Sequence, residues 1–392
     1  MYDIIVIGGG LGGAAFAKAM AEGGARVLVL ERDTQFKDRV RGEWIAPWGV
    51  AETQKLGLYN ALLERCAHEV PYWKDVMQPA RDFRTTTPQG LPVLTVYHPM
   101  MQDTVLDCAS NSGAEVWRGA TVRGLKPGSQ PLAIVEHESR SSELTARLVV
   151  CADGRNSTCR AWGGFATIRG TQKLLGAGIL LENLSIDDDA THNALNPFVP
   201  RWALLVPQGK GRARAYCFYR SDVERLQGAD DTVRFIEESI KSGLPVDMYA
   251  GAKPAGPLAS FDMTETWVDH PYRSGVVLLG DAAGASDPSW GQGLSLTLRD
   301  ARILAENLLS SDDWDAAAHA YAAAHDRYFS VERIVGQWAF DLFFAGDVEA
   351  DTRRARALPL LAAEPGRFPD HFFGGPELSC DQSVRRRFYG ED

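Results

Sequence analysis

Apolar and polar positions follow one another at the start of the chain in an order that predicts its first elements. The apolar run Ile4 to Ile7 is typical of a buried strand, and it is followed by glycines and then by an Ala-rich stretch to about Glu22. A second apolar run, Val27 to Leu30, ends on Glu31. The pattern therefore predicts a strand, a tight turn, a helix and a second strand.

Two later apolar runs predict further buried strands, and each ends on a small acidic motif. Leu148 to Cys151 precedes Asp153-Gly154, and Val276 to Leu279 precedes Gly280-Asp281. In an open α/β sheet, ligands bind outside the carboxyl ends of the strands. We therefore expect these two strand ends and the first glycine-rich turn to converge on one long ligand.

The middle of the chain, from about 168 to 267, has a different pattern. Its strand-like runs are Leu174 to Leu181, Trp202 to Val206 and Arg214 to Arg220, separated by polar turns and followed by a helical stretch near 230–242. This pattern predicts an antiparallel sheet. Beyond about 312 the chain is Ala-rich, which predicts helices that end in a Pro/Gly-rich tail.

One helix is predicted next to the last acidic motif. Pro288 and the segment Gly291-Gln292-Gly293 precede a stretch from Leu294 to about Leu309 whose apolar residues recur at helical spacing. The N-terminus of a helix presents free N–H groups and a partial positive charge. We expect this helix to point its N-terminus at the ligand.

The first glycines form a dinucleotide-binding fingerprint. Gly8, Gly10 and Gly13 fit the pattern G-x-G-x-x-G in a strand–turn–helix setting, with the acidic Glu31 at the end of the next strand. The first glycine allows the tight turn, the second lets the backbone approach a pyrophosphate, and the third lets helix and strand pack closely. Glu31 is suited to accept hydrogen bonds from ribose hydroxyls. The nucleotide could be NAD or FAD.

Composition and charge exclude several classes of protein. The 392 residues carry a net charge of −10, which argues against a nucleic-acid partner. No apolar run reaches the roughly 18 residues of a membrane span, and the first residues lack a basic signal region. Six scattered cysteines and eight dispersed histidines show no metal-ligand spacing. We expect a cytoplasmic protein without a metal site, either a monomer or a homodimer.

Four segments, taken in order, resemble the single-component flavoprotein monooxygenases typified by para-hydroxybenzoate hydroxylase. GGGLGG with Leu30-Glu31-Arg32 looks like the family's ADP-binding start, and RGEWIAPWGVAETQKLGL looks like its Arg-Gly segment. CADGRNSTCR and LLGDAAGASDPSWGQGLSLTLRDARILAENL are similar to its two later motifs. The resemblance implies an α/β fold, with a Rossmann-like FAD-binding domain, an inserted antiparallel β-sheet substrate domain and a helical C-terminus.

The expected domains are discontinuous. Residues 1–73, 97–167 and 268–345 are assigned to the FAD-binding domain. Residues 74–96 and 168–267 are assigned to the substrate domain, and residues 346–392 to the C-terminal segment.

The resemblance also implies cofactor contacts. It places Asp281 on the ribityl chain of a non-covalent FAD, Arg41 near the flavin and its pyrophosphate, and Asp153-Gly154 at both FAD and the nicotinamide co-substrate. The predicted cofactor-binding residues are Gly8, Gly10, Leu11, Gly12, Gly13, Glu31, Arg32, Arg41, Asp153, Gly154, Gly280, Asp281, Pro288, Gly291, Gln292, Gly293 and Leu294.

The sequence motifs indicate catalytic and substrate residues less clearly than they indicate the cofactor contacts. The family's histidine after the last acidic motif is Gly284 here, and a basic residue of the family appears as His98, which could contact flavin or be a core histidine. The candidate catalytic residues are His98, Trp290, Gly291 and Gln292. The candidate substrate contacts are Trp44, Trp48, Trp202, Tyr216 and Phe218, although an aromatic residue on a half-buried strand is usually part of the core.

The implied activity is oxygenation of an aromatic or polycyclic molecule with NADPH or NADH and O₂, through a flavin C4a-hydroperoxide. Two alternatives share the fold: a geranylgeranyl-reductase-like enzyme and a flavin-dependent halogenase, whose G-W-x-W-x-I-P signature the sequence lacks. An alternative of another class is a non-catalytic protein that binds flavin or another ligand.

Overall fold

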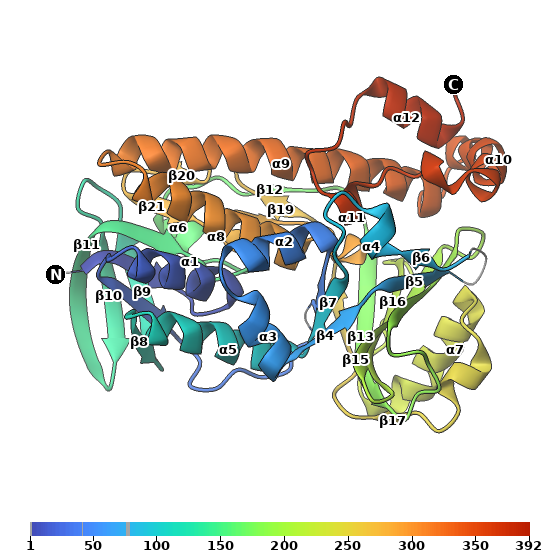
Figure 1. Cartoon of the computed structure of the whole chain (residues 1–392), viewed down its shortest axis with the longest axis horizontal. Coiled ribbons are helices and arrows are strands. Elements are labelled where there is room, and N and C mark those ends of the chain that lie inside the picture. The colour runs from blue at the N-terminus through green and yellow to red at the C-terminus, as the bar shows by residue number, and fades with distance from the viewer. Residues whose placement is uncertain (1, 41, 76–78) are drawn as a thin grey trace.

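A computed structural model describes residues 2–40, 42–75 and 79–392, so the predicted contact at Arg41 lies outside the described residues. The molecule is elongated, with one sheet near each end and a long helix running beside both (Figure 1). The mixed α/β architecture, with a largely parallel sheet, an antiparallel sheet and a helical C-terminal segment, confirms the predicted fold class.

The first sheet contains the strands predicted at the start of the chain and at the two acidic motifs. Its order is β20-β21-β11-β1-β2-β8, and only β20 runs antiparallel along this path. Ile7 at the end of β1 pairs with Leu30 and Cys151, and Cys151 pairs with Leu278. The three predicted strand ends therefore lie side by side. The bounds are β1 Tyr2–Ile7, β2 Val27–Glu31, β8 Glu115–Arg118, β11 Arg140–Cys151, β20 Tyr272–Arg273 and β21 Val276–Leu278.

Helices and a small antiparallel extension cover the two faces of this sheet. Helix α1 (Leu11–Glu22) packs between α5 (His98–Asn111) and α8 (Gly293–Leu309), and an apolar core joins them to one face. Strands β9 (Thr121–Lys126) and β10 (Leu132–His137) form a meander with β11, and they share a second core with the other face.

The second sheet is the predicted antiparallel one, in the order β17-β13-β16-β15-β14-β5-β6, with β18 also paired to β13. Among the described residues of this sheet, only β14 and β5 pair in parallel. Helix α7 (Thr232–Ser242) lies against one face over an apolar core. The bounds are β5 Tyr72–Asp75, β6 Arg81–Asp82, β13 Leu174–Glu182, β14 Ala190–Asn196, β15 Arg201–Gly209, β16 Arg212–Arg220, β17 Lys253–Pro254 and β18 Ala259–Asp262.

Short elements connect the two sheets. Two small sheets lie between them, one of β3, β7 and β4 and one of β12, β19 and β22. The bounds are β3 Trp44–Ile45, α2 Pro47–Lys55, α3 Tyr59–Arg65, β4 Ala67–Val70, α4 Phe83–Thr86, β7 Val93–Val96, α6 Cys159–Trp162, β12 Ile168–Arg169, β19 Thr266–Trp267 and β22 Gly284–Ala285.

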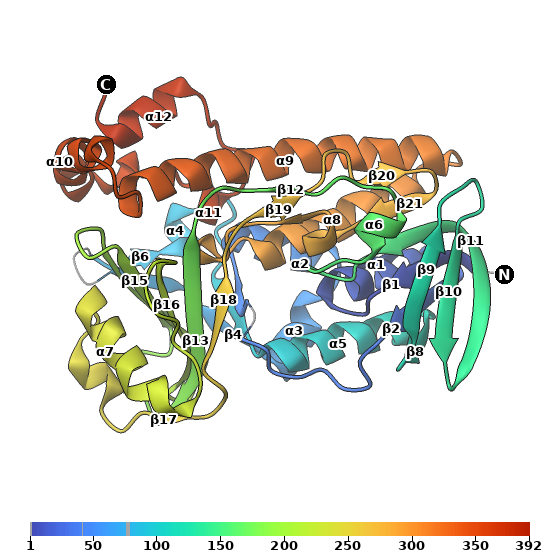
Figure 2. The ribbon, with the colours of Figure 1, turned by 180° about the vertical axis from the view of Figure 1, so that it is seen from behind.

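The C-terminal segment is helical, as predicted, and it returns over the second sheet. Helix α9 (Trp314–Phe343) runs the length of the molecule, and the remaining helices cluster at the end where the second sheet lies (Figures 1 and 2). Their bounds are α10 Val348–Ala363, α11 His371–Gly374 and α12 Gln382–Tyr389. In the described part of the chain, no helix is both long and apolar enough to cross a membrane.

The domain boundaries stay a prediction. Strand β5 carries residues from both sides of the boundary expected between 73 and 74, and all of it pairs within the second sheet.

Candidate active site

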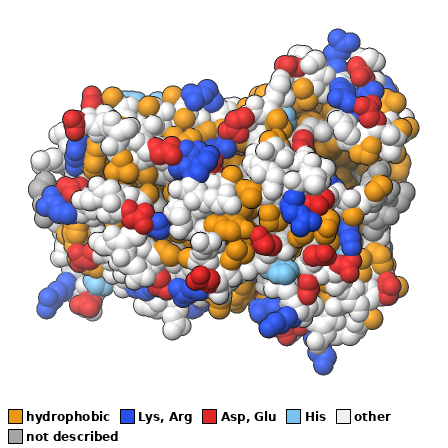
Figure 3. Space-filling model, viewed as in Figure 1, with side chains coloured by type: hydrophobic (Ala, Val, Ile, Leu, Met, Phe, Trp, Pro, Cys, Tyr) orange, Lys and Arg blue, Asp and Glu red, His pale blue; other side chains and the backbone are white. Residues whose placement is uncertain are grey.

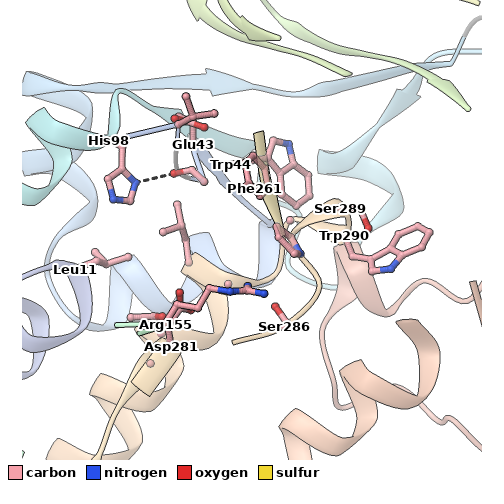
Figure 4. Close-up of a pocket in the computed structure, with 18 of the residues that line it drawn as sticks. Leu11, Glu43, Trp44, His98, Arg155, Phe261, Asp281, Ser286, Ser289 and Trp290 are labelled. Carbon is pink, nitrogen blue, oxygen red and sulfur yellow. Dashed lines mark hydrogen bonds between the residues drawn. The ribbon is translucent and has the colours of Figure 1, made fainter. Parts of the chain in front are cut away.

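One large cavity, of about 1690 Å³, lies between the two sheets. Its walls come from the first glycine-rich turn, the three neighbouring strand ends, the start of α8, the second sheet and the C-terminal segment. In the close-up, Leu11 lies at one end of the cavity and Trp290 at the other, and Arg155 extends toward Ser286 (Figure 4). The cavity exceeds the roughly 300–1,000 Å³ of a single small-molecule pocket, so it has room for more than one ligand.

The glycine-rich turn has the geometry that the fingerprint predicts. Gly8 has a φ of +104°, and a β-carbon there would lie 2.4 Å from the carbonyl oxygen of Ala152. A β-carbon on Gly13 would lie 2.0 Å from the carbonyl oxygen of Gly8. At Gly10, by contrast, the nearest atom to a β-carbon would be Gln102 Nε2 at 3.4 Å, and this glycine lines the cavity. Gly8 and Gly13 thus serve close packing, whereas Gly10 leaves room for a ligand.

Glu31 ends β2 at the wall of the cavity. Its Oε2 accepts a hydrogen bond from the Gly9 amide at 2.7 Å, and its Oε1 accepts one from the Asp33 amide at 2.7 Å. An ionised carboxylate has about four acceptor positions, so two remain for ligand hydroxyls. The neighbouring Arg32 also lines the cavity.

Asp153 and Arg160 connect the second and third strand ends. Asp153 Oδ2 accepts hydrogen bonds from the amides of Thr158 and Cys159 at 2.9 and 3.2 Å. Its Oδ1 is buried and has no partner among the described residues. The buried Arg160 guanidinium donates to the carbonyl oxygen of Ala282 at 2.7 Å and to that of Asp281. This guanidinium therefore fixes the two acidic motifs relative to each other.

Asp281 lies beside the N-terminus of α8 and lines the cavity. A β-carbon on Gly293 would be 3.8 Å from Asp281 Oδ1. The turn before it is held from behind, because the Gly280 amide donates to Asp300 Oδ2 at 2.8 Å. Asp300 belongs to the same sequence motif, yet its contacts are with this amide, His325 and Tyr328. It positions the turn and does not line the cavity.

The start of α8 is shaped by Gly291, which has a φ of +70°. A β-carbon there would lie 2.8 Å from Trp44 Cε3, so the glycine lets this indole approach the helix start. Pro288, Gly291, Gly293 and Leu294, which the sequence predicts as cofactor contacts, line the cavity.

Gln292 and Trp48 depart from the sequence prediction, because neither side chain lines the cavity. Gln292 Nε2 donates to the carbonyl oxygens of Trp290 and Phe372, and Trp48 Nε1 donates to Gln292 Oε1 at 3.0 Å. Trp48 is 1% exposed, and the Arg299 guanidinium lies 4.6 Å from the centre of its ring. These contacts correct the expectation that Trp48 meets substrate and that the Gln292 side chain takes part in catalysis.

The other aromatic candidates do line the cavity. They are Trp44, Trp202, Tyr216, Phe218 and Trp290. His98 begins α5 at the cavity wall, and its Nδ1 lies 2.8 Å from the carbonyl oxygen of Gly42 (Figure 4). The indole Nε1 atoms of Trp44 and Trp290 and Ser286 Oγ are buried and unpaired in the part of the chain that the structure describes.

Sequence reasoning missed a buried cluster of charged groups at the wall. Arg214, which is fully buried, donates to Glu43 Oε1 at 3.1 Å and to both oxygens of Asp38 at 2.7 and 2.8 Å. Tyr216 Oη donates to Glu43 Oε2. Burial raises the pKa of the Glu43 carboxyl to about 7, although the Arg214 charge opposes this. Glu43 and Tyr216 both line the cavity.

Arg155 was also missed, although it lies between Gly154 and Ser157 of a recognised motif. Its guanidinium donates to the carbonyl oxygen of Thr264 and reaches into the cavity (Figure 4). Its position within that motif was the available signal.

These residues fit FAD, the cofactor that the resemblance implies. The open Gly10, the acceptor positions of Glu31 and the unpartnered Asp153 Oδ1 lie in the walls of one elongated cavity. Helices α1 and α8 both begin at this cavity, and helix N-termini favour phosphate and other negative charge.

Removing the carboxylate of Asp281 is expected to weaken retention of FAD. Asp281→Ala should lower affinity by about 10- to 150-fold, because a charge-assisted hydrogen bond contributes about 1.5–3 kcal/mol. Flavin content after gel filtration and dilution measures the change, with the exposed Asp230→Ala as control. Equal flavin retention in both variants would remove Asp281 from the flavin contacts.

Comparisons with known proteins support the same cofactor. A family model described as FAD binding domain matches residues 1–336. The chain is 25% identical over 337 residues to digeranylgeranylglycerophospholipid reductase 2 of Methanopyrus kandleri, covering 81% of this chain and 80% of that protein. It is 26% identical over 397 residues to 3-demethoxyubiquinol 3-hydroxylase of Escherichia coli, covering 92% and 94%.

A solved structure shows the likeness of fold. The p-nitrophenol 4-monooxygenase of Pseudomonas putida superposes with a TM-score of 0.79 at 19% identity, covering 99% of this chain and 96% of that one.

Proposed function

Because the chain belongs to the FAD-binding-domain family of class A flavoprotein monooxygenases, we propose that it oxygenates an aromatic or polycyclic small molecule with O₂ and NAD(P)H. One observation carries the proposal. The part of the cavity that suits FAD continues, without a wall between, into a compartment lined by Trp44, Trp202 and Trp290.

The start of α8 and the aromatic walls would act on the reaction in different ways. FAD, reduced by NAD(P)H, supplies the electrons that activate O₂. The free N–H groups at the start of α8 favour negative charge beside them. Trp44, Trp202 and Trp290 keep water away from the reacting ring.

Substrate orientation would rest on donors that have no partner in the described protein. An indole N–H can only donate, so Trp44 Nε1 and Trp290 Nε1 suit a ligand with oxygen acceptors. A hydroxylated or carbonyl-bearing ring meets this requirement.

Proton movement would use Tyr216 and Glu43. A substrate hydroxyl can pass its proton to Tyr216 Oη while Tyr216 passes its own proton to Glu43 Oε2, the atom it already contacts. A carboxyl with a pKa of about 7 can accept and return a proton near neutral pH. Arg214 holds the carboxyl through Glu43 Oε1, and Asp38 in turn holds Arg214.

Alkene reduction is the second candidate, because the reductase of Methanopyrus kandleri is among the relatives. It needs the same FAD site, so that site does not separate the two reactions. A flavin-binding protein without catalysis would show no substrate-stimulated NAD(P)H oxidation.

Labelling with oxygen-18 tests the proposed function. With a phenol or quinol that stimulates NAD(P)H oxidation, we expect O₂ and NAD(P)H to be consumed in near-equal amounts. The product should carry one oxygen-18 atom from labelled O₂. Turnover that continues without air and leaves the product unlabelled would support the reductase instead.

A further inference from the structure

The cavity has an apolar outer part, which we call the annex. It is formed where the C-terminal segment passes over the second sheet, and the side chains that the described part of this segment places on the cavity are apolar. The C-terminal wall consists of Phe343, Leu358, Leu361, Ala362, Pro365 and Phe368. Leu195 and Pro197, at the end of β14, line the cavity as well.

Neighbouring aromatic rings connect the annex to the start of α8. Trp290 stacks on Phe372 with ring centres 4.6 Å apart and an interplanar angle of 8°. Phe372 contacts Phe368 at 5.9 Å, and Phe368 contacts Phe343 at 6.3 Å. The annex therefore extends outward from the position at which a ring would meet the flavin.

Exposed apolar side chains lie next to the annex in the chain. Next to the lining residue Pro197, Phe198 is 81% exposed and Val199 is 44% exposed. On the face in Figure 3, hydrophobic side chains gather between the C-terminal helices and the second sheet. Moving a polar group out of water without a new hydrogen-bond partner costs free energy. The apolar wall of the annex therefore disfavours polar parts of a ligand.

From this continuity we propose that the annex binds a hydrocarbon tail of the substrate. The substrate would be a ring with oxygen substituents, held near Trp44 and Trp290, that carries a long alkyl or isoprenoid chain lying along Leu358 and Leu361. The inference rests on the proposed function for the ring. Binding of the tail, however, can be measured without turnover.

A series of 4-alkylphenols tests the proposal with the FAD-loaded protein. Binding is followed by the change in flavin absorbance, and turnover by NAD(P)H oxidation. Each added methylene that enters the annex should tighten binding by about fourfold, because burial of one CH₂ contributes about 0.8 kcal/mol. Affinity that does not change with chain length would overturn the proposal.

Neighbouring positions on α10 provide a matched control. Leu361 lines the annex, whereas Leu360 is 36% exposed and does not line the cavity. Leu361→Asp should flatten the dependence of affinity on chain length, and Leu360→Asp should preserve it. Equal losses in the two variants would also overturn the proposal.

A second variant tests the site without adding charge. Ala362→Trp should fill the annex and weaken long alkylphenols while leaving phenol itself unaffected, whereas Ala363→Trp should change neither. If affinity rises with the length of the alkyl chain but no alkylphenol is oxygenated, the annex stands and the proposed function fails. If short phenols are oxygenated but added chain gives no tighter binding, the proposed function stands and the annex fails.

Discussion

Gly13→Ala is expected to give a protein that retains no FAD and is less stable by about 3 kcal/mol or more. The new β-carbon would lie 2.0 Å from the carbonyl oxygen of Gly8, and both are backbone positions that no side-chain rotation can relieve. Helix α1 would have to move away from β1, which destroys the glycine-rich turn. Flavin absorbance and urea unfolding measure the two effects.

Two other glycines separate packing from ligand contact. Gly10→Ala should leave the stability of the FAD-free protein almost unchanged, because a β-carbon has space there, but it should block the approach of a pyrophosphate. At Gly128 a β-carbon would meet nothing within 4 Å, so Gly128→Ala should retain both stability and flavin. Full flavin occupancy in Gly13→Ala would contradict the assignment of this turn.

Arg214→Met should destabilise the protein by about 3–5 kcal/mol near pH 8, because it leaves the carboxylates of Glu43 and Asp38 close together without their shared cation. Loss of the Arg214 charge should raise the pKa of Glu43 above its present value of about 7. A carboxyl whose folded pKa is raised stabilises the fold while it is protonated, and this contribution is lost as pH rises through the folded value. The deficit should therefore be smaller near pH 5.

The double variant Glu43→Gln/Arg214→Met is the control for this second prediction. It has no carboxylate at position 43, so it should recover part of the loss near pH 8 and show a weaker dependence on pH. Urea unfolding at both pH values measures the free energy of unfolding. A loss below about 1 kcal/mol near pH 8 in the single variant would show that the cluster does not stabilise the fold.

The first sheet could be predicted because its signals are local. The apolar runs that form β1, β2, β11 and β21 are each followed by glycines or acidic residues. An apolar run and the residues that follow it can be recognised within a short stretch of sequence. The convergence of their ends followed from the rule that ligands bind at the carboxyl ends of parallel strands.

The buried cluster was beyond sequence reasoning because its members are distant in the chain. Glu43 is 171 residues from Arg214 and 173 from Tyr216, so only the folded chain brings them together. The expectation that Trp48 contacts substrate needed correction for a related reason, because the direction of its indole depends on α8 and on Gln292. The C-terminal segment was predicted to be helical, but the spacing of its apolar residues does not reveal which surface of the protein it covers.

The order of strands in the first sheet has a consequence for synthesis of the protein. Strand β1 can pair with β2 as soon as both have left the ribosome, but β11 and β21 are separated by more than a hundred residues. At 5–20 residues per second, translation of that interval takes roughly 6–25 s. Strands β13 to β18 of the second sheet are made during this time, so they can pair with one another before β21 completes the first sheet. We therefore expect capture of FAD to be a late event, after β13 to β18 have emerged and β21 has joined the first sheet.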